Sequence, residues 1–131
     1  MIDIKHLSIT FDRVIFDDAS ITLSNNSITT IKGKSGTGKT TLLNQLGLVA
    51  PLACDYLMEG HSIDDPLTTR KEKIGYVHQE STLFNNMTIR ENMEFAFLLS
   101  GQEYNETRMN DILCSMKIEH LLNQTPDHVS G

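Results

Sequence analysis

The sequence contains no tryptophan and only two cysteines among its 131 residues. Cys54 and Cys114 stand far apart and belong to no C-x-x-C pattern, so no disulfide framework or cysteine-based metal motif is indicated. We expect two reduced and mostly buried thiols. His78 is assigned no chemistry. The other histidines also lack metal-ligand spacing and are expected at the surface, namely His6, His61, His120 and His128.

Long apolar runs are absent as well. No stretch approaches the roughly 18 apolar residues that a membrane-spanning helix needs. Met1–Thr10 alternates polar and apolar residues instead of forming the apolar run of a signal peptide. These absences predict a cytoplasmic chain. The N-x-[ST] matches therefore carry no glycosylation meaning at Asn25, Asn86 or Asn105.

Positive charge is scarcer than negative charge. The 11 Lys and Arg residues and the 17 Asp and Glu residues give a formal net charge of -6, which argues against a nucleic-acid partner. No internal repeat, low-complexity tract or linker-like segment divides the chain, so residues 1–131 are expected to belong to one domain. Hydrophobic content is 39% and charged content 21%, as in ordinary globular proteins.

One stretch of the chain carries a specific motif. Residues 33–41 read Gly-Lys-Ser-Gly-Thr-Gly-Lys-Thr-Thr and fit the phosphate-binding loop pattern G-x-x-x-x-G-K-[ST] without a mismatch. A β-rich run, Ser27–Lys32, is predicted to be a strand before the loop, and Thr40–Leu48 is predicted to begin a helix after it. This order of elements lets backbone N–H groups and a helix N-terminus converge on phosphate.

The residue types in the loop match phosphate chemistry. The glycines Gly33, Gly36 and Gly38 let the loop amides turn inward with no Cβ in the way. Lys39 is a compact cation that can reach β- and γ-phosphates. The Thr40 hydroxyl can bind Mg²⁺, which keeps most of its water ligands. The predicted ligand is a Mg²⁺–nucleoside triphosphate, and the motif alone does not choose between ATP and GTP.

The part of the chain before the loop is predicted to be antiparallel β structure. Near-alternating apolar positions predict a strand over Ile2–Ile9, followed by a turn at Phe11–Arg13. Two short strands are expected next, at Val14–Phe16 and Ala19–Leu23. This β region leads into the strand, loop and helix of the phosphate-binding motif.

Helices dominate the prediction for the rest of the chain. Asp64-Asp65-Pro66 places acidic residues before a proline, which is typical of a helix start. A later helix is expected to turn an apolar face inward, formed by Met93, Ala96, Phe97, Leu98 and Leu99. The other expected elements are an edge strand at Tyr56–Met58, a core strand at Ile74–Val77, and helices at Thr88–Leu99, Tyr104–Met116 and Ile118–Leu122.

Four features give the chain a family resemblance. The loop has the finer form G-x-S-G-x-G-K-[ST]-T, and Ile74–Gln79 is similar to a strand that enters a glutamine loop. Leu83-Phe84 and Met87–Asn92 are similar to the segment after it. Phe11, just before Val14, stands where the family places an aromatic residue against adenine. Together they resemble the N-terminal part of an ABC transporter ATP-binding subunit. The resemblance implies an α/β P-loop nucleotide hydrolase fold with an N-terminal antiparallel β subdomain and a helical segment after the glutamine loop.

The resemblance also implies a role for each site residue, with ATP and Mg²⁺ as ligands. Phe11 would stack on the base with Val14 beside it, Lys39 would hold the β- and γ-phosphates, and Thr40 would bind Mg²⁺. Gln79 would contact Mg²⁺ or the attacking water. The remaining loop residues of the ATP site are Gly33, Ser35, Gly36, Thr37, Gly38 and Thr41. The alternatives are a turn residue covering the sheet edge at Phe11 and a solvated polar residue at Gln79.

Some features of the family have no counterpart in the sequence. Val129-Ser130-Gly131 resembles the first three residues of the family signature, after which the family places an Asp for Mg²⁺, a catalytic Glu and a switch His. Residues 1–131 are therefore expected to be the N-terminal part of the ATP-binding domain, incomplete at the C-terminus. Because phosphoryl transfer needs groups that position the nucleophile, ATP turnover by these residues stays open.

The resemblance implies a subunit that couples ATP binding and hydrolysis to transport. It would work as a dimer with a transmembrane permease, in the cytoplasm at the inner face of the cell membrane. Leu42–Leu48 and Tyr56–Gly60 resemble small cassettes that export peptides or lipoproteins. Two alternatives stay open, namely a truncated nucleotide-binding protein without turnover and a soluble ABC protein of translation or DNA repair.

Overall fold

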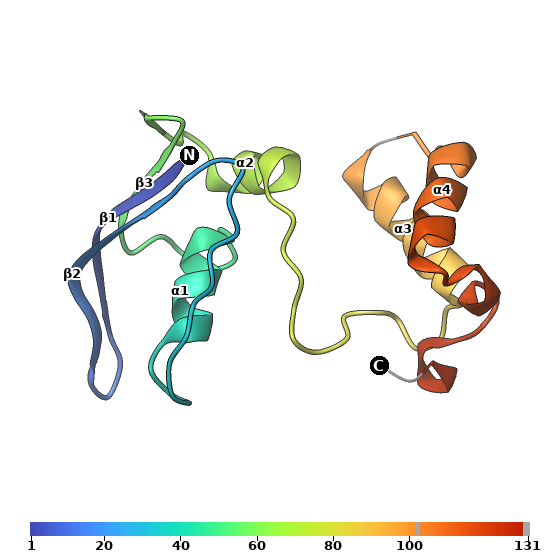
Figure 1. Ribbon diagram of the computed structural model, residues 1–131, viewed down its shortest axis with the longest axis horizontal. Helices are drawn as coiled ribbons and strands as arrows, with labels where there is room; N and C mark the ends of the chain where they lie inside the picture. Colours follow the sequence, from blue (N-terminus) through green and yellow to red (C-terminus); the bar gives the residue numbers. More distant parts are fainter. Residues whose placement is uncertain (102, 130–131) are drawn as a thin grey trace. The chain divides into compact units, whose positions relative to one another are not determined.

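The computed structural model describes residues 1–101 and 103–129. The chain forms two compact units, the first over Met1–Tyr76 and the second from Val77 onward. Figure 1 labels the elements of each unit. Each unit has a small hydrophobic core of its own.

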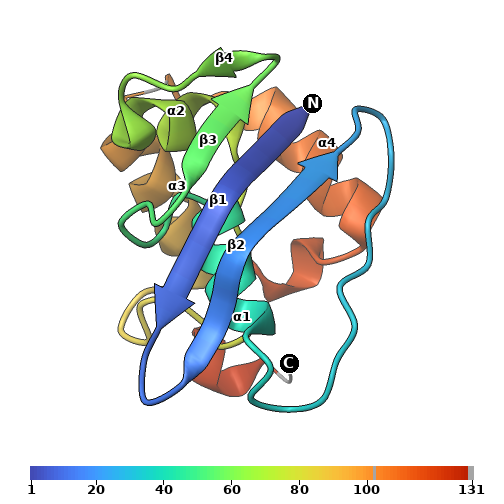
Figure 2. The same cartoon turned by 90° about the vertical axis from the view of Figure 1, so that its left-hand side faces the viewer.

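The first unit is built on a four-stranded antiparallel sheet. Its strands are β1 (Ile2–Thr10), β2 (Val14–Leu23), β3 (Asp55–Met58) and β4 (His61–Ser62), in the order β2-β1-β3-β4 (Figure 2). The antiparallel region predicted before the loop is confirmed. The expected pair of short strands at 14–16 and 19–23 is one strand, β2, which carries an irregularity instead of a break.

Backbone irregularities set which side chains of this sheet are buried. Ile4 and Leu7 are three residues apart and would point to opposite faces of a regular strand, yet both are only 1% exposed. The register with β2 shifts between them, and His6 adopts a φ of 54°. On β2, Asp18 has a φ of 49°, and its carboxylate lies 2.7 Å from Nδ1 of His6. The two irregularities return Leu7 to the core face.

The helix α1 (Lys39–Leu46) covers one face of this sheet. The buried core consists of Ile4 and Leu7 from the sheet, Leu42, Leu46 and Leu48 from the helix and its end, and Tyr56 from β3. The Tyr56 hydroxyl donates to the Leu46 carbonyl at 2.9 Å. Burial raises the pKa of Tyr56 to about 12. The hydrogen bond therefore ties α1 to β3 within an apolar layer.

A buried glutamine makes a second link from α1 to the chain that follows. The side-chain amide of Gln45 donates to the Pro51 carbonyl, and its carbonyl oxygen accepts the Ala53 N–H, both at 2.9 Å. Gln45 is only 3% exposed. Since a buried amide is tolerated when its donors and acceptors are paired, the residue fixes the path from α1 into β3.

The helix start predicted at Asp64-Asp65-Pro66 is confirmed, and a tight turn precedes it. Glu59 and Gly60 adopt positive φ values of 52° and 81°, which form the tight turn between β3 and β4. Asp65 caps α2 (Pro66–Lys73), with its carboxylate accepting from the Thr68 hydroxyl at 2.6 Å and the Leu67 N–H at 3.0 Å. These two bonds lower the pKa of Asp65.

Three strand predictions need correction. Tyr56–Met58 is not an edge strand, because β3 lies between β1 and β4. Ser27–Lys32 and Ile74–Val77 are not strands, since the sheet of the described residues includes neither segment. Ile28 is 98% exposed and Val77 is 94% exposed. A β-rich segment becomes a strand only when a neighbour pairs with its backbone groups.

The second unit is helical. It contains α3 (Ile89–Ser100), α4 (Glu106–Met116) and the short 3₁₀ turns η1 (Glu119–Leu121) and η2 (Pro126–His128). The predicted helices around 88–99, 104–116 and 118–122 are confirmed within a few residues at their ends. Pro126 is the first residue of η2.

The start of α3 is held by a reciprocal cap. The Thr88 hydroxyl accepts the Glu91 N–H at 3.2 Å, and the Glu91 carboxylate accepts the Thr88 N–H at 2.7 Å. The Thr88 backbone and hydroxyl donors lower the pKa of Glu91. Two orphan donors of the helix are satisfied in this way.

The core of the second unit is smaller than the apolar pattern suggests. Met109, Leu113 and Leu122 are buried, and Met93 and Phe97 of α3 pack against them. The rest of the predicted apolar face is wrong, because Ala96, Leu98 and Leu99 are exposed. At 3.6 residues per turn, consecutive leucines cannot all share a face with Met93 and Phe97.

The cysteine prediction is half right. Both thiols are free, but Cys54 is only half-buried and Cys114 is exposed. Burial raises the pKa of Cys54, and the neighbouring Glu119 carboxylate raises the pKa of Cys114. Within residues 1–101 and 103–129, no helix combines the length and the apolar character needed to cross a membrane.

Candidate functional site

The loop at residues 33–38 connects an irregular segment to the first residue of α1. Gly36 and Gly38 adopt φ values of 75° and 93°, in the left-handed region that favours glycine. Gly38 is the N-cap of α1, and Lys39 is its first helical residue. The motif glycines therefore stand at the two positions where the loop turns most sharply.

Close packing also favours glycine at Gly33 and Gly38. A Cβ on Gly38 would lie 2.4 Å from Cγ2 of Ile15, and a Cβ on Gly33 would lie 2.8 Å from Oγ1 of Thr37. Ile15 belongs to β2, so the loop lies tightly against the sheet at Gly38. A larger residue at Gly38 would force the loop away from β2, and one at Gly33 would displace the Thr37 hydroxyl.

The side chains of the loop brace it from within. Nζ of Lys39 donates to the Gly33 carbonyl at 2.9 Å and to the Lys34 carbonyl at 2.7 Å. The Thr37 hydroxyl also donates to the Lys34 carbonyl, at 2.9 Å. The ammonium of Lys39 thus lies at the loop carbonyls, where a phosphate oxygen could replace them as its acceptor.

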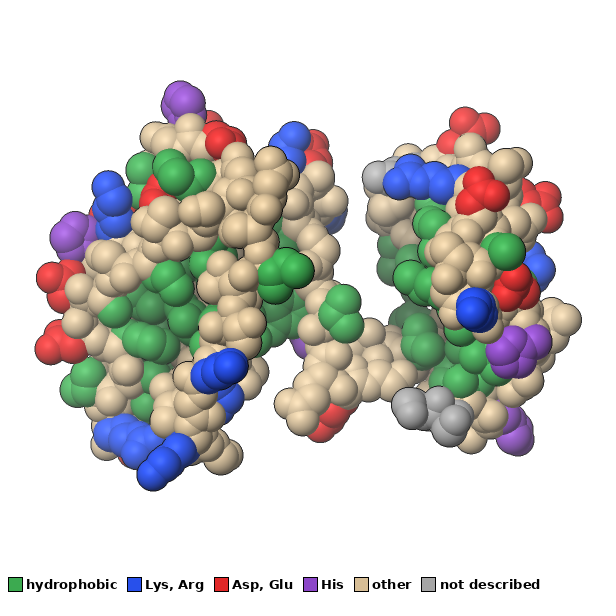
Figure 3. Space-filling view, in the orientation of Figure 1, with side chains coloured by type: hydrophobic (Ala, Val, Ile, Leu, Met, Phe, Trp, Pro, Cys, Tyr) green, Lys and Arg blue, Asp and Glu red, His purple; other side chains and the backbone are tan. Residues whose placement is uncertain are grey.

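A pocket of about 340 Å³ lies beside the loop. Lys and Arg side chains gather at the lower end of the first unit, where the loop enters α1 (Figure 3). The pocket is lined by Phe16, Ile31, Lys32, Gly33, Thr37, Gly38, Lys39 and Leu42. The lining combines apolar walls with a cationic end, which suits a ligand that carries negative charge on one side.

The N-terminus of α1 adds to the positive potential of this end. The first turn of the helix contains no acidic residue, so no side chain compensates its dipole. Thr40 is exposed and Thr41 is half-buried in this turn. Free backbone donors, a helix dipole and the Lys39 ammonium together favour an anion with several oxygens.

The turn between β1 and β2 lies against the same loop. The Arg13 guanidinium donates to the Gly36 carbonyl, and the Phe11 N–H donates to the Arg13 carbonyl at 3.0 Å. Phe11 is 67% exposed and Val14 is 61% exposed. The structure therefore brings the predicted base-stacking residues to the end of the unit that holds the phosphate loop. Arg13 was not predicted as a site residue, although a basic residue two positions after Phe11 was a signal.

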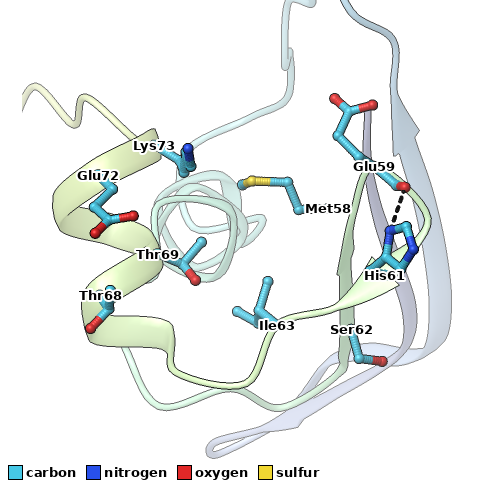
Figure 4. Close-up of a pocket in the computed structure, with 9 residues that line it drawn as sticks. All are labelled: Met58, Glu59, His61, Ser62, Ile63, Thr68, Thr69, Glu72 and Lys73. Carbon is cyan, nitrogen blue, oxygen red and sulfur yellow. Dashed lines mark hydrogen bonds between the residues drawn. The ribbon is translucent and has the colours of Figure 1, made fainter.

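A second pocket of the first unit involves none of the predicted site residues. It measures about 490 Å³ and lies between the β3–β4 hairpin and α2 (Figure 4). Met58 and Ile63 form apolar walls, and Glu72 and Lys73 reach it from α2. Nδ1 of His61 hydrogen-bonds with the Glu59 carbonyl at 3.0 Å.

Gln79 belongs to the second unit, in an exposed irregular segment before α3. The segment is fastened by Asn92, a buried residue that the sequence analysis missed. Oδ1 of Asn92 accepts the Phe84 N–H at 2.7 Å, and its Nδ2 donates to the Phe84 carbonyl and the Thr88 carbonyl, both at 3.0 Å. The available signal was that Asn92 is polar although it stands one helical turn before Ala96, a member of the predicted apolar face.

The predicted family signature lies mostly beyond the described residues. Val129 follows η2 and is half-buried. Ser130 and Gly131 lie outside the part of the chain that the structure describes, so the expectation for 129–131 stays a prediction.

Comparison with known proteins agrees with this geometry. A family model described as ABC transporter matches residues 16–131. The molybdenum import ATP-binding protein ModC of Photobacterium profundum is 36% identical over 122 residues, which cover 87% of this chain and 32% of the relative. The macrolide export ATP-binding/permease protein MacB of Campylobacter jejuni is 27% identical over 92% of this chain and 20% of the relative. The chain thus spans under a third of the length of these curated relatives.

The fold has a close counterpart among solved structures. The dimeric structure of MJ0796, a bacterial ABC transporter cassette, superposes with a TM-score of 0.81 and 26% identity, covering 100% of this chain and 64% of that chain. The likeness confirms the predicted α/β P-loop nucleotide hydrolase fold, with its antiparallel β subdomain and its helical segment. Since the family match also covers most of the sequence, the chain belongs to the ABC transporter family.

Proposed function

We propose that the first unit binds Mg²⁺–ATP at the loop of residues 33–41. The observation that carries this proposal is the position of the Lys39 ammonium, 2.7–2.9 Å from two loop carbonyls, at the dipole-positive start of α1. A triphosphate oxygen is a stronger acceptor for that ammonium than a carbonyl. ATP would therefore replace internal hydrogen bonds of the loop with bonds to its own phosphates.

Each residue of the loop has a proposed part in this exchange. Lys39 holds the β- and γ-phosphates, and the backbone N–H groups of the loop and the first turn of α1 surround them. The residues proposed to surround the phosphates are Gly33, Ser35, Gly36, Thr37, Gly38, Thr40 and Thr41. Phe11 stacks on adenine with Val14 beside it, because both side chains are exposed on the turn that contacts Gly36.

The residues present also fit a magnesium ion bound with the nucleotide. Thr40 presents an exposed hydroxyl in the first turn of α1, and a neutral hydroxyl is a ligand that Mg²⁺ accepts beside phosphate oxygens and water. When bound, the ion neutralises charge on the phosphates. Gln79, exposed in the second unit, is proposed to contact the same ion or the attacking water.

At the level of the whole protein, we infer an ATP-binding subunit that couples ATP binding and hydrolysis to transport. Residues 1–131 are proposed to be the N-terminal part of its ATP-binding domain. A second ATP-binding subunit and a membrane permease at the inner face of the membrane are the proposed partners, in keeping with the dimeric cassette and with the import and export proteins that the chain resembles.

The cargo is a separate proposal. Peptide or lipoprotein export rests on the likeness of Leu42–Leu48 and Tyr56–Gly60 to small export cassettes. The relatives name different cargoes, including macrolides, molybdenum and Fe³⁺. Their variety fits a shared ATP-binding engine with cargo choice made by the permease.

The test is binding of a fluorescent ATP analogue to the full-length protein and to Lys39→Ala. We expect the substitution to abolish binding or nearly so, because the triphosphate loses its cationic partner. Lys34→Ala is the matched control, since it removes the same charge from an exposed position of the same loop. Equal affinity of Lys39→Ala and the unaltered protein would overturn the assignment.

A further inference from the structure

Arg13 is the one side chain of the β1–β2 turn with a described hydrogen bond to the phosphate loop. Its guanidinium donates to the Gly36 carbonyl. It also packs over Gly36, because a Cβ built there would lie 3.6 Å from the same terminal nitrogen. Arg13 thus contacts the residue whose φ of 75° makes the sharp turn of the loop.

This contact determines the orientation of one peptide group. In a trans peptide, the carbonyl of one residue points opposite to the N–H of the next residue. By holding the Gly36 carbonyl on its own side, Arg13 directs the Thr37 N–H away from itself. An amide in this loop is useful to a phosphate only when it has that fixed direction before the ligand arrives.

The other hydrogen bonds that support the loop come from its own side chains, and those of Lys39 would change when phosphate binds. Lys39 holds the Gly33 and Lys34 carbonyls through the ammonium that the phosphates would claim. The Thr37 hydroxyl bond to Lys34 is formed within the loop. Arg13 reaches the loop from another element, so its hydrogen bond does not depend on where the Lys39 ammonium lies.

We propose that Arg13 is a positioning residue that braces the Gly36–Thr37 peptide from outside the loop and thereby raises its affinity for a triphosphate group. The inference rests on the proposed function of the loop and adds a residue to it. It concerns the phosphates and not the base. Removing Arg13 should therefore weaken the binding of a ligand without a base by the same factor as it weakens the binding of ATP.

The first measurement needs no ligand. Amide ¹H–¹⁵N spectra and hydrogen exchange of the full-length protein are compared with those of Arg13→Gln and of Asp12→Asn, which alters a charge in the same turn. We expect Arg13→Gln to shift the Gly36 and Thr37 amides and to speed exchange at Thr37, and Asp12→Asn to leave them in place. Unmoved Gly36 and Thr37 amides in Arg13→Gln would overturn the brace.

The second measurement uses Mg²⁺–ATP and Mg²⁺–tripolyphosphate as probes. Arg13→Gln should weaken both by the same factor, about three- to tenfold, the order of one charge-assisted hydrogen bond at an exposed site. Arg13→Lys should recover part of the loss. The difference should persist at high salt, where the Debye length falls to a few Å and long-range attraction is screened.

The outcomes separate this proposal from the function that it rests on. A loss for ATP without a loss for tripolyphosphate, or a loss that vanishes at high salt, would overturn the brace while leaving the ATP site intact. If the unaltered protein binds neither probe, the proposed function fails. The amide spectra then decide by themselves whether Arg13 orients the loop.

Discussion

At the scale of single residues, the exposed Phe11 is the most direct test of base recognition. Its side chain is 67% exposed on a turn that contacts the phosphate loop. A phenyl ring offers a π-face and no polar group that could select an exocyclic substituent. Recognition at this position would therefore depend on stacking more than on hydrogen bonds.

We predict that Phe11→Ala weakens ATP binding by about 1–2 kcal/mol, the order of one base–aromatic stack. Phe11→Trp should keep the affinity, since it keeps a π-face. Titration of a fluorescent ATP analogue gives both values, and tripolyphosphate affinity should be unchanged in both variants. Equal ATP affinity of Phe11→Ala and the unaltered protein would make Phe11 a packing residue of the turn.

Tyr56 gives the protein a predicted dependence on alkaline pH. Its folded pKa is raised by burial to about 12, above the value of about 10 in an unfolded chain. The folded state then holds the proton more tightly, so this stabilisation is fully present below pH 10 and is lost as the pH rises toward 12.

Tyr56→Phe should remove this dependence. It also deletes the hydrogen bond to the Leu46 carbonyl and should lower stability at neutral pH by about 1 kcal/mol. Urea unfolding from pH 8 to pH 11 measures both effects. A variant that loses stability above pH 10 as steeply as the unaltered protein would show that another group titrates there.

At the scale of elements, the sequence predicted best what depends on neighbours along the chain. The helix start at Asp64-Asp65-Pro66 and the helices expected at 88–99 and 104–116 depend on groups within a few residues of one another. The strands expected at 27–32 and 74–77 depend on distant backbone partners, which residue spacing does not reveal. The phosphate loop was predictable because its chemistry requires particular residues at fixed spacing.

Arg13 and Asn92 were not predicted because their roles, like strand pairing, depend on contacts between separate segments. Each acts through a contact between segments: Arg13 with the Gly36 carbonyl, and Asn92 with the backbone of Phe84. The sequence signals, a basic residue two positions after Phe11 and a polar residue four positions before Ala96, are shared by many ordinary surface residues. Burial identifies Asn92, at 7% exposure, and burial follows from the tertiary fold.

We predict that Asn92→Ala lowers the stability of the second unit by about 1–3 kcal/mol, the cost of leaving buried backbone groups without partners. The Phe84 N–H should exchange faster in the variant, because it loses its acceptor at 2.7 Å. Asn110→Ala, on the exposed side of α4, is the control and should have little effect. Unchanged melting and Phe84 exchange would contradict a fastening role for Asn92.

At the scale of the whole molecule, the proposed site combines the phosphate-binding loop with Gln79, and none of its proposed residues is a carboxylate. The described acids that follow α3 are all exposed: Glu103 in an irregular segment, Glu106 and Asp111 in α4, Glu119 in η1 and Asp127 in η2. None of them follows a buried strand, where the family places its catalytic carboxylates. Binding and turnover should therefore separate in this polypeptide.

We predict that residues 1–131, expressed by themselves, release no phosphate from ATP above the level of Lys39→Ala. Positioned carboxylates and water account for much of the acceleration in phosphoryl transfer. A continuous phosphate-release assay with and without Mg²⁺ measures this. Mg²⁺-dependent release that Lys39→Ala removes would show that the described residues contain a complete catalytic centre.

The two hydrogen bonds that Lys39 donates to the Gly33 and Lys34 carbonyls give its ammonium a second role, as a support of the loop. It supports the curvature of the loop from the position that a ligand would take over. A substitution at Lys39 therefore changes the shape of the loop as well as its attraction for the nucleotide. The affinity lost in Lys39→Ala therefore combines the lysine–phosphate contact, the two loop hydrogen bonds that binding would break and the change in loop shape.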